Sequence, residues 1–218
     1  MDNLNNYIEH TLLKQDAKKE DLLKLFDEAK ANNFLGVCIN PCYVKLAKEN
    51  LKNSDVKVVT VIGFPLGANT TETKIFETIN AIKDGADEID MVINVTKVKD
   101  KETEFIVDEI KQIKAACQGH NLKVILETDL LEKDEIKYAC ECAIKGGADF
   151  VKTSTGFVKG GVGAKAEDVE LMYKTVKDAG LQVKASGGIR DKEAALNMIK
   201  AGAVRLGTSS GVKIISEG

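Results

Sequence analysis

Three charged residues, Asp90, Lys152 and Lys184, lie inside apolar runs of strand length. Charged side chains are seldom buried without a partner or a function. We therefore expect these three residues to carry chemistry. The structural alternative is an interior ion pair between Asp90 and one lysine, or a Lys152 side chain that extends outward to solvent.

Alternation along a strand predicts that Lys152 points into a barrel while Val151 packs outward, and it places Lys184 inside in the same way. Two ammonium groups close together in a partly desolvated site lower the pKa of a lysine from about 10.4 toward the working pH. The resulting neutral amine can attack a carbonyl group and form an imine. Asp90 would project into the same interior and exchange protons with Lys184.

The elements that must position these residues follow an α/β pattern, because short apolar runs alternate with segments of helical periodicity. Helices are expected over residues 19–32, 73–83 and 103–116, each with one apolar stripe. Eight strands are expected, over residues 7–11, 35–40, 57–63, 88–94, 122–128, 150–154, 182–186 and 204–207.

A weak internal repeat supports this count of strands. Gly-Ala recurs at Gly85, Gly147 and Gly202, 62 and 55 residues apart, each time between an expected helix and an expected strand. Each spacing fits two βα units of roughly 30 residues. Such units build an open doubly wound sheet or a closed barrel, and glycine loops after the last two strands favour the barrel. We predict one domain, residues 1–218, folded as a single (β/α)8 TIM barrel without a linker.

Those two loops predict a phosphate site. Backbone amides exposed by glycine, with hydroxyl groups beside them, suit a phosphate dianion. The chain lacks the GxGxxG and GxxxxGK[ST] patterns, which argues against dinucleotides and nucleoside triphosphates. The candidate phosphate-binding residues are Gly187, Gly188, Gly207, Thr208, Ser209 and Ser210.

Composition excludes several classes of protein. The formal net charge is −3 and no basic stripe is present, so we expect no nucleic-acid partner. The longest nearly apolar run, residues 56–68, is too short for a membrane span. The first residues lack a secretory signal, and an odd count of five cysteines fits reduced thiols, so we expect a cytoplasmic protein. Cysteine and histidine spacing predicts no metal site.

Several polar residues have equally good structural and functional interpretations. Glu127 could bond a lysine or cap the segment that follows it. Thr153 ends an expected strand at the presumed mouth and is a further substrate-binding candidate, although such residues are common at strand ends. Thr70 is expected to cap the helix that follows it. Cys38 and Cys42 are expected to be small core residues.

The chain resembles the deoxyribose-phosphate aldolase family over nearly its whole length. The motifs that carry the resemblance are IEHTLL (8–13), VCINP (37–41), VIGFPLG (61–67), GADEIDMVIN (85–94), ADFVKTSTGF (148–157), VKASGGIR (183–190) and LGTSSG (206–211). The resemblance implies a (β/α) barrel that reversibly cleaves 2-deoxy-D-ribose 5-phosphate to D-glyceraldehyde 3-phosphate and acetaldehyde, with no cofactor or metal. It also suggests that the protein is a homodimer and that its ligands are small phosphorylated sugars and aldehydes.

By the same resemblance, Lys152 matches the Schiff-base lysine, Lys184 the second lysine and Asp90 the proton-transferring aspartate. The phosphate group is expected at the amides of the two glycine loops. Two departures occur: Glu9 replaces the usual aspartate of the first strand, and the loop over residues 158–165, with Lys159, replaces a Pro-Gly-Gly-Ala-Thr version. We expect the chemistry to survive the change at Glu9.

Two other functions fit the same residues. A phosphosugar isomerase or epimerase would use Asp90 and Glu127 as acid and base without an imine. A non-catalytic phosphosugar-binding barrel would use the lysines only to neutralise the ligand. An aspartate between two interior lysines argues against the second of these, because binding alone needs no proton transfer.

Overall fold

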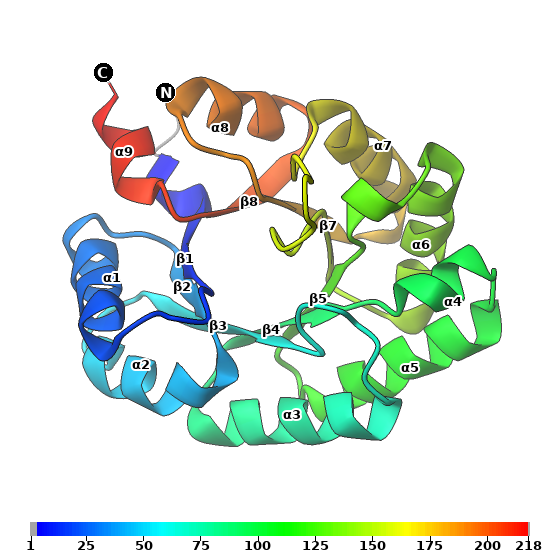
Figure 1. Ribbon diagram of the computed structural model, residues 1–218, viewed down its shortest axis with the longest axis horizontal. Coiled ribbons are helices and arrows are strands. Elements are labelled where there is room, and N and C mark those ends of the chain that lie inside the picture. Colours follow the sequence, from blue (N-terminus) through cyan, green and yellow to red (C-terminus); the bar gives the residue numbers. More distant parts are fainter. Residues whose placement is uncertain (1–3, 218) are drawn as a thin grey trace.

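The computed structural model describes residues 4–217. In it, eight parallel strands close into a barrel in chain order. Figure 1 shows this barrel. This confirms the predicted (β/α)8 fold. The strands are β1 (Ile8–Leu12), β2 (Gly36–Ile39), β3 (Lys57–Ile62), β4 (Glu88–Val92), β5 (Asn121–Ile125), β6 (Phe150–Lys152), β7 (Gln182–Ser186) and β8 (Ala203–Thr208).

Helices surround the barrel (Figure 1). They are α1 (Lys19–Ala31), α2 (Val44–Leu51), α3 (Thr71–Asp84), α4 (Val95–Lys99), α5 (Thr103–Ala116), α6 (Lys133–Gly146), α7 (Ala166–Val176), α8 (Lys192–Lys200) and α9 (Gly211–Ser216), with 3₁₀ turns η1 (Leu4–Tyr7), η2 (Pro41–Tyr43), η3 (Thr128–Leu130) and η4 (Lys177–Ala179). Thr70 caps α3 as expected, because its hydroxyl accepts a hydrogen bond from Thr73 N. Within residues 4–217, no helix has both the length and the apolar character that a membrane span needs.

Several strands end earlier than the sequence predicts. The predicted strand over residues 88–94 stops at Val92, because the Asn94 side chain accepts a hydrogen bond from Lys97 N and caps α4. The predicted strand over residues 122–128 stops at Ile125, and Glu127 takes a left-handed conformation with φ 62°. The predicted strands are therefore too long, because they include polar residues that turn the chain at the mouth of the barrel.

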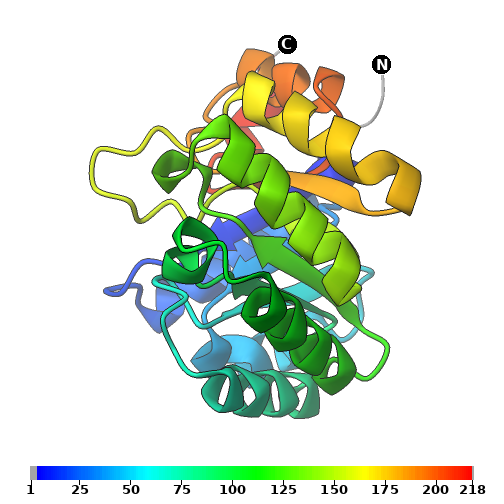
Figure 2. The ribbon, with the colours of Figure 1, turned by 90° about the vertical axis from the view of Figure 1, so that its right-hand side faces the viewer.

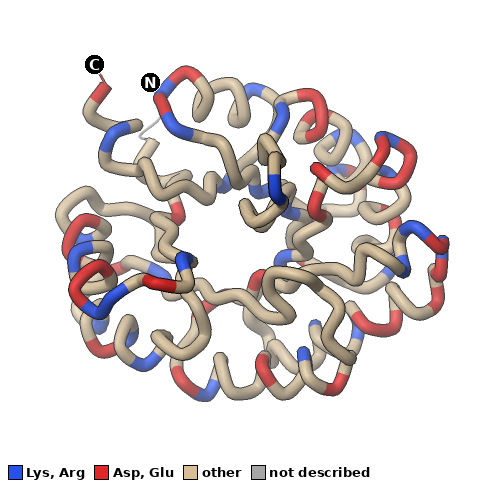
Figure 3. The backbone as a smooth tube through the Cα atoms, viewed as in Figure 1, with Lys and Arg blue, Asp and Glu red and all other residues tan. Residues whose placement is uncertain are grey.

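The strands have two different faces. Their outward side chains, such as Val151 and Val183, join the large apolar core between the barrel and the helices. Inside the barrel, Cys38, Val59 and Val61 pack with Leu13 in a small separate cluster. Much of the remaining interior is charged, and Figure 3 shows charged residues on the ring of strands as well as on the outer helices.

The internal repeat has a structural cause. Asp87 and Asp149, the third residues of two Gly-Ala-Asp segments, each accept a hydrogen bond from a backbone amide at the start of the preceding strand. Each also pairs with a lysine of a preceding helix, Lys48 for Asp87 and Lys114 for Asp149. The repeated aspartate therefore joins one βα unit to the next and helps to set the register of the barrel.

Candidate active site

Strand register brings the three predicted catalytic side chains together. Lys152 of β6 is the direct neighbour of Lys184 of β7, so the two lysines lie side by side on the barrel wall. Asp90 extends from β4 into the same space. Its Oδ2 atom lies 2.8 Å from Lys152 Nζ and 2.7 Å from Lys184 Nζ. Asp90 and both lysines are buried.

The charge balance of the lysine pair differs from the sequence expectation. Asp90 lies between the two ammonium groups, and Lys184 also donates a hydrogen bond to Glu9. Burial alone would lower the pKa of Lys184, but the carboxylates of Asp90 and Glu9 outweigh burial and raise it. The prediction that mutual repulsion lowers a lysine pKa is therefore wrong for Lys184, which stays protonated because two carboxylates bind it.

Asp90 itself remains ionised. Burial alone would raise the pKa of its carboxyl group, but Lys123, Lys152 and Lys184 together hold it well below its usual range. Lys123 of β5 donates a hydrogen bond to the other oxygen, Oδ1, at 3.0 Å. The site thus contains a third buried lysine that the sequence analysis did not select.

Asp90, Lys184, Glu9 and Lys123 form a buried charge layer that continues toward the opposite end of the barrel. Lys123 Nζ lies 2.6 Å from Glu88 Oε2, and Glu88 also pairs with Lys57 at 2.9 Å. Burial alone would raise the pKa of Glu88, but Lys123 and Lys57 lower it to about 2. A sequence signal existed for Lys123, because it too lies inside an apolar run, between Leu122 and Val124.

A cavity of about 740 Å³ opens at the carboxyl end of the strands. Lys152 lines it, whereas Lys184, Asp90 and Lys123 do not. Among the buried lysines of the site, Lys152 is therefore the one whose amine a ligand in the cavity can reach. The other lining residues are Thr11, Leu12, Leu13, Lys14, Gln15, Asp16, Ser154, Thr155, Gly156, Phe157, Ser186, Gly187, Gly188, Ile189, Arg190, Gly207, Thr208 and Ser209.

The predicted phosphate loops form one wall of this cavity. Gly187, Gly188, Gly207, Thr208 and Ser209 all line it. A side chain at Gly188, where φ is 75°, would place its Cβ 2.3 Å from the carbonyl oxygen of Val162. The glycine thus allows the loop between β6 and α7 to pack against the β7 loop, and Figure 2 shows that loop, in yellow, extending beyond the barrel.

Two sequence candidates, Thr153 and Ser210, lie outside the cavity wall, and so does Lys159 of the loop that departs from the family pattern. Thr153 is fully buried, and its hydroxyl group donates to Ser186 O and accepts from Ser186 N, so it links β6 to β7. Ser210 follows the lining residue Ser209 and is not itself among the lining residues. Lys159 is exposed on the β6–α7 loop and also does not line the cavity. Arg190, which was not selected from sequence, does line it.

Among the described residues, the Glu127 side chain neither bonds a lysine nor caps η3. Its carboxylate accepts hydrogen bonds from the backbone N of Thr155 at 3.0 Å and from the Thr155 hydroxyl group. Burial raises the pKa of Glu127, although the bonds from Thr155 oppose that shift. Glu127 therefore ties the end of β5 to the segment that follows Lys152.

The residue at the aspartate-to-glutamate departure, Glu9, belongs to the buried charge layer. It is fully buried, does not line the cavity, and lies 3.6 Å from Arg205 Nε and 3.7 Å from Lys123 Nζ, in addition to its bond with Lys184. Its carboxylate therefore acts on Lys184 rather than on a ligand in the cavity.

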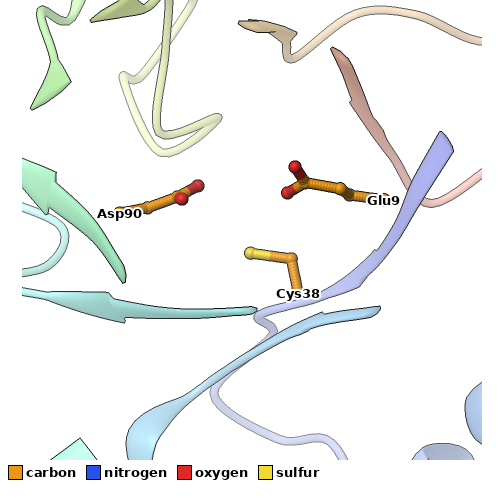
Figure 4. Close-up of side chains that lie close together, drawn as sticks. All are labelled: Glu9, Cys38 and Asp90. Atoms are coloured by element: carbon orange, nitrogen blue, oxygen red, sulfur yellow. The ribbon is translucent and has the colours of Figure 1, made fainter. Parts of the chain in front are cut away.

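Glu9, Cys38 and Asp90 point toward a common space, as Figure 4 shows, and their potential ligand atoms lie within 4.8 Å of one another. Lys184 already donates to both carboxylates. Burial raises the pKa of the Cys38 thiol, which keeps it from becoming the thiolate that metals bind. The arrangement thus suits an ammonium group better than a metal ion. Cys42, expected in the core, is exposed because it lies on η2 at the surface.

Comparison with known proteins gives a consistent result. A family model described as DeoC/LacD family aldolase matches residues 7–217. The deoxyribose-phosphate aldolase of Finegoldia magna is 55% identical over 97% of this chain and 98% of its own, and that of Bacillus cytotoxicus is 56% identical over 98% and 95%.

Solved structures agree with the sequence relatives. A protein described as QR15, an aldolase, superposes with a TM-score of 0.94 at 42% identity, covering 100% of this chain and 96% of its own. A tetrameric deoxyribose phosphate aldolase from Aeropyrum pernix superposes with a TM-score of 0.90 at 34% identity, covering 97% and 89%.

Proposed function

Because this chain belongs to the DeoC/LacD aldolase family, we propose that it reversibly cleaves 2-deoxy-D-ribose 5-phosphate to D-glyceraldehyde 3-phosphate and acetaldehyde through an imine on Lys152. One observation carries the assignment of the nucleophile: Lys152 lines the cavity, while Lys184 lies behind it between two carboxylates.

The reaction begins when the neutral amine of Lys152 attacks C1 of the open-chain aldehyde. Loss of water from the carbinolamine gives a protonated imine, which withdraws electrons from C2. Asp90 Oδ2, 2.8 Å from Lys152 Nζ, is placed to accept the proton that the lysine must lose.

Cleavage breaks the bond between C2 and C3, because acetaldehyde keeps two carbons and the phosphorylated product keeps three. The C3 hydroxyl group gives up its proton, the electron pair of the broken bond moves to the imine nitrogen, and an enamine remains. Protonation of the enamine at C2 and addition of water then release acetaldehyde and restore the amine. Asp90, with Lys184 bound to it at 2.7 Å, takes up the C3 hydroxyl proton through ordered water, and the pair returns a proton to C2.

The phosphate group binds at the glycine loops after β7 and β8. Gly187, Gly188, Thr208 and Ser209 offer backbone amides and hydroxyl groups to an anion. Arg190 at the cavity wall supplies a positive charge. Thr153 and Ser210, the other candidates from sequence, adjoin these loops: the Thr153 hydroxyl group bonds the backbone of Ser186, and Ser210 N donates to Thr208 Oγ1.

The isomerase alternative is less well supported. It needs Glu127 as a free acid or base, and Glu127 accepts two hydrogen bonds from Thr155. Asp90 is likewise bound by three lysines rather than directed at the cavity.

The experiment is borohydride reduction of the protein in the presence of acetaldehyde, followed by peptide mapping. Reduction traps an imine as an ethyl group on the lysine that formed it. We expect the ethyl group on Lys152 alone, and none on the matched Lys152→Met variant. An unmodified, folded protein would instead support the isomerase or the binding barrel. Deuterium exchange into a sugar phosphate would then indicate the isomerase, and binding of deoxyribose 5-phosphate without turnover would indicate the binding barrel.

We also propose that residues 1–218 act as one aldolase domain, in the cytoplasm, as a homodimer without a nucleic-acid partner. The five cysteines of the described chain are free thiols and four are buried, which fits a reducing compartment. Light scattering of the purified protein measures the assembly and distinguishes a dimer from a tetramer like that of the Aeropyrum pernix relative.

A further inference from the structure

Lys123 is a buried lysine at the site that the reaction above does not use. It lies on β5 as the register neighbour of Asp90 on β4 and of Phe150 on β6. Its side chain is fully buried and does not line the cavity. A ligand therefore cannot reach its ammonium group directly.

The groups that face Lys123 come from strands β1, β4, β6, β7 and β8. Asp90 Oδ1 lies at 3.0 Å, Glu88 Oε2 at 2.6 Å and Glu9 Oε1 at 3.7 Å from Lys123 Nζ. The ring of Phe150 lies beneath the ammonium at 5.7 Å, with Arg205 over the same ring at 5.5 Å. Lys184 is close enough to repel it.

The two oxygens of Asp90 are used differently. Oδ2 accepts hydrogen bonds from Lys152 and Lys184, whereas Oδ1 accepts one from Lys123. Lys152 loses its positive charge when it becomes a nucleophile, so its attraction for Asp90 changes during the reaction. Lys123 keeps its charge, because burial, which lowers its pKa, is outweighed by Asp90 and Glu9. It therefore gives Asp90 a partner that does not change during turnover.

Charge balance for Glu88 alone does not account for Lys123. Glu88 has two further cations of its own, Lys57 at 2.9 Å and Arg205 at 3.7 Å. Asp90 Oδ1, in contrast, has Lys123 as its hydrogen-bond partner among the described residues. Loss of Lys123 would leave this oxygen buried and unpaired, and free the carboxylate to rotate.

We propose that Lys123 is a positioning residue for the aldolase reaction: by binding Oδ1 of Asp90, it holds Oδ2 toward Lys152 and Lys184, the two amines with which Asp90 exchanges protons. This inference rests on the proposed function, since it assigns a task to Asp90 that only the imine mechanism requires. Lys123 acts through Asp90 and does not touch the substrate.

The test uses Lys123→Met with Lys74→Met as its matched control. Lys74 is also a fully buried lysine, paired at 2.9 Å with the buried Glu109. It lies on the outer helix α3, outside the site. Three properties are measured in each protein: ethyl trapping on Lys152, deuterium uptake into the methyl group of acetaldehyde in D2O, and the pH profile of kcat.

For Lys123→Met we expect trapping on Lys152 to persist, while deuterium uptake and kcat fall by roughly 10²-fold. The acid limb of its kcat profile should move to higher pH, because Asp90 loses a neighbouring cation and becomes easier to protonate. Lys74→Met should unfold at a lower temperature yet keep the wild-type pH profile.

Unchanged deuterium uptake with an unshifted pH profile in folded Lys123→Met would overturn the proposal. If the single variant does not fold, Lys123→Met/Glu88→Gln removes one cation and one carboxylate together and receives the same measurements. Failure of both variants to fold would also overturn it, since Lys123 would then be needed for folding alone. Absence of trapping in the wild-type protein would instead refute the proposed function, so the two failures are distinct.

Discussion

Lys152 and Lys184 donate hydrogen bonds to one and the same oxygen, Asp90 Oδ2, at 2.8 and 2.7 Å. Although the two lysines share this acceptor, they differ in their other contacts. Lys184 also binds Glu9 and is shut off from the cavity, whereas Lys152 lines it. Of the two adjacent lysines of β6 and β7, Lys152 is thereby the amine that a ligand can reach, and Lys184 is a buried cation held by carboxylates.

Lys184→Met should lower kcat by roughly 10²- to 10⁴-fold, because proton transfer by a positioned group contributes about that factor. Trapping of acetaldehyde on Lys152 should remain detectable by mass spectrometry. The variant removes the cation that both buried carboxylates share, which leaves Asp90 with Lys123 and Lys152 and leaves Glu9 with only longer contacts to Arg205 and Lys123. This loss costs up to about 3–5 kcal/mol of stability. Lys184→Met/Glu9→Gln restores the charge balance and separates the two effects: recovery of both stability and turnover would show that Lys184 is structural.

Glu88 predicts a specific acid sensitivity. The folded state lowers its pKa from about 4.5 to about 2. Its contribution to stability is therefore present above pH 4.5 and is lost as the pH falls toward 2. The shift corresponds to roughly 3 kcal/mol. Glu88→Gln should be less stable than wild type at pH 7, and the difference should shrink between pH 4.5 and 2 in urea unfolding curves. A difference that stays constant over this range would contradict the prediction.

The sequence was sufficient for the fold and for the three central side chains. Alternating apolar strands and helical stripes predicted the barrel, and a charge inside an apolar run identified Asp90, Lys152 and Lys184. The same signal is present at Lys123, but a charge inside an apolar run does not by itself distinguish a reacting lysine from one that only pairs with carboxylates. Glu9 and Glu88 were missed as partners because their ion pairs depend on the closure and register of the barrel: Glu9 of β1 meets Lys184 of β7, and Glu88 of β4 meets Lys123 of the adjacent β5.

The polar residues at the mouth could not be placed in the same way. Whether a hydroxyl group at a strand end faces a ligand depends on one residue of register. Thr153 is one position beyond the inward-facing Lys152 and therefore points outward, where it bonds the backbone of Ser186. Glu127 depends on a left-handed backbone turn that no local pattern predicts for glutamate.

Glu127 and Thr155 should act as a unit. Their side-chain and backbone hydrogen bonds join the end of β5 to the chain just after Lys152. Glu127→Ala and Thr155→Val should each lower kcat/KM, and the double variant should lose less than the sum of both single losses. A coupling of about 0.5–3 kcal/mol is expected for residues in direct contact. Additive losses, measured by steady-state kinetics, would refute the coupling.

Gly188→Ala tests the phosphate wall with a matched control at Gly180. Both glycines have positive φ, 75° and 83°, so alanine costs each about 1–2 kcal/mol of backbone strain. A Cβ at Gly180 meets nothing within 4 Å, whereas one at Gly188 meets Val162 O at 2.3 Å. Gly188→Ala should therefore displace the β6–α7 loop and raise the KM for deoxyribose 5-phosphate. Gly180→Ala should lower only the unfolding temperature.

Deuterium uptake into acetaldehyde, which carries no phosphate, should remain near the wild-type rate in Gly188→Ala, because Lys152 and Asp90 lie outside the displaced loop. Equal loss of acetaldehyde exchange and of phosphosugar turnover would show instead that Gly188 supports the lysine site, and the phosphate group would then bind elsewhere on the cavity wall.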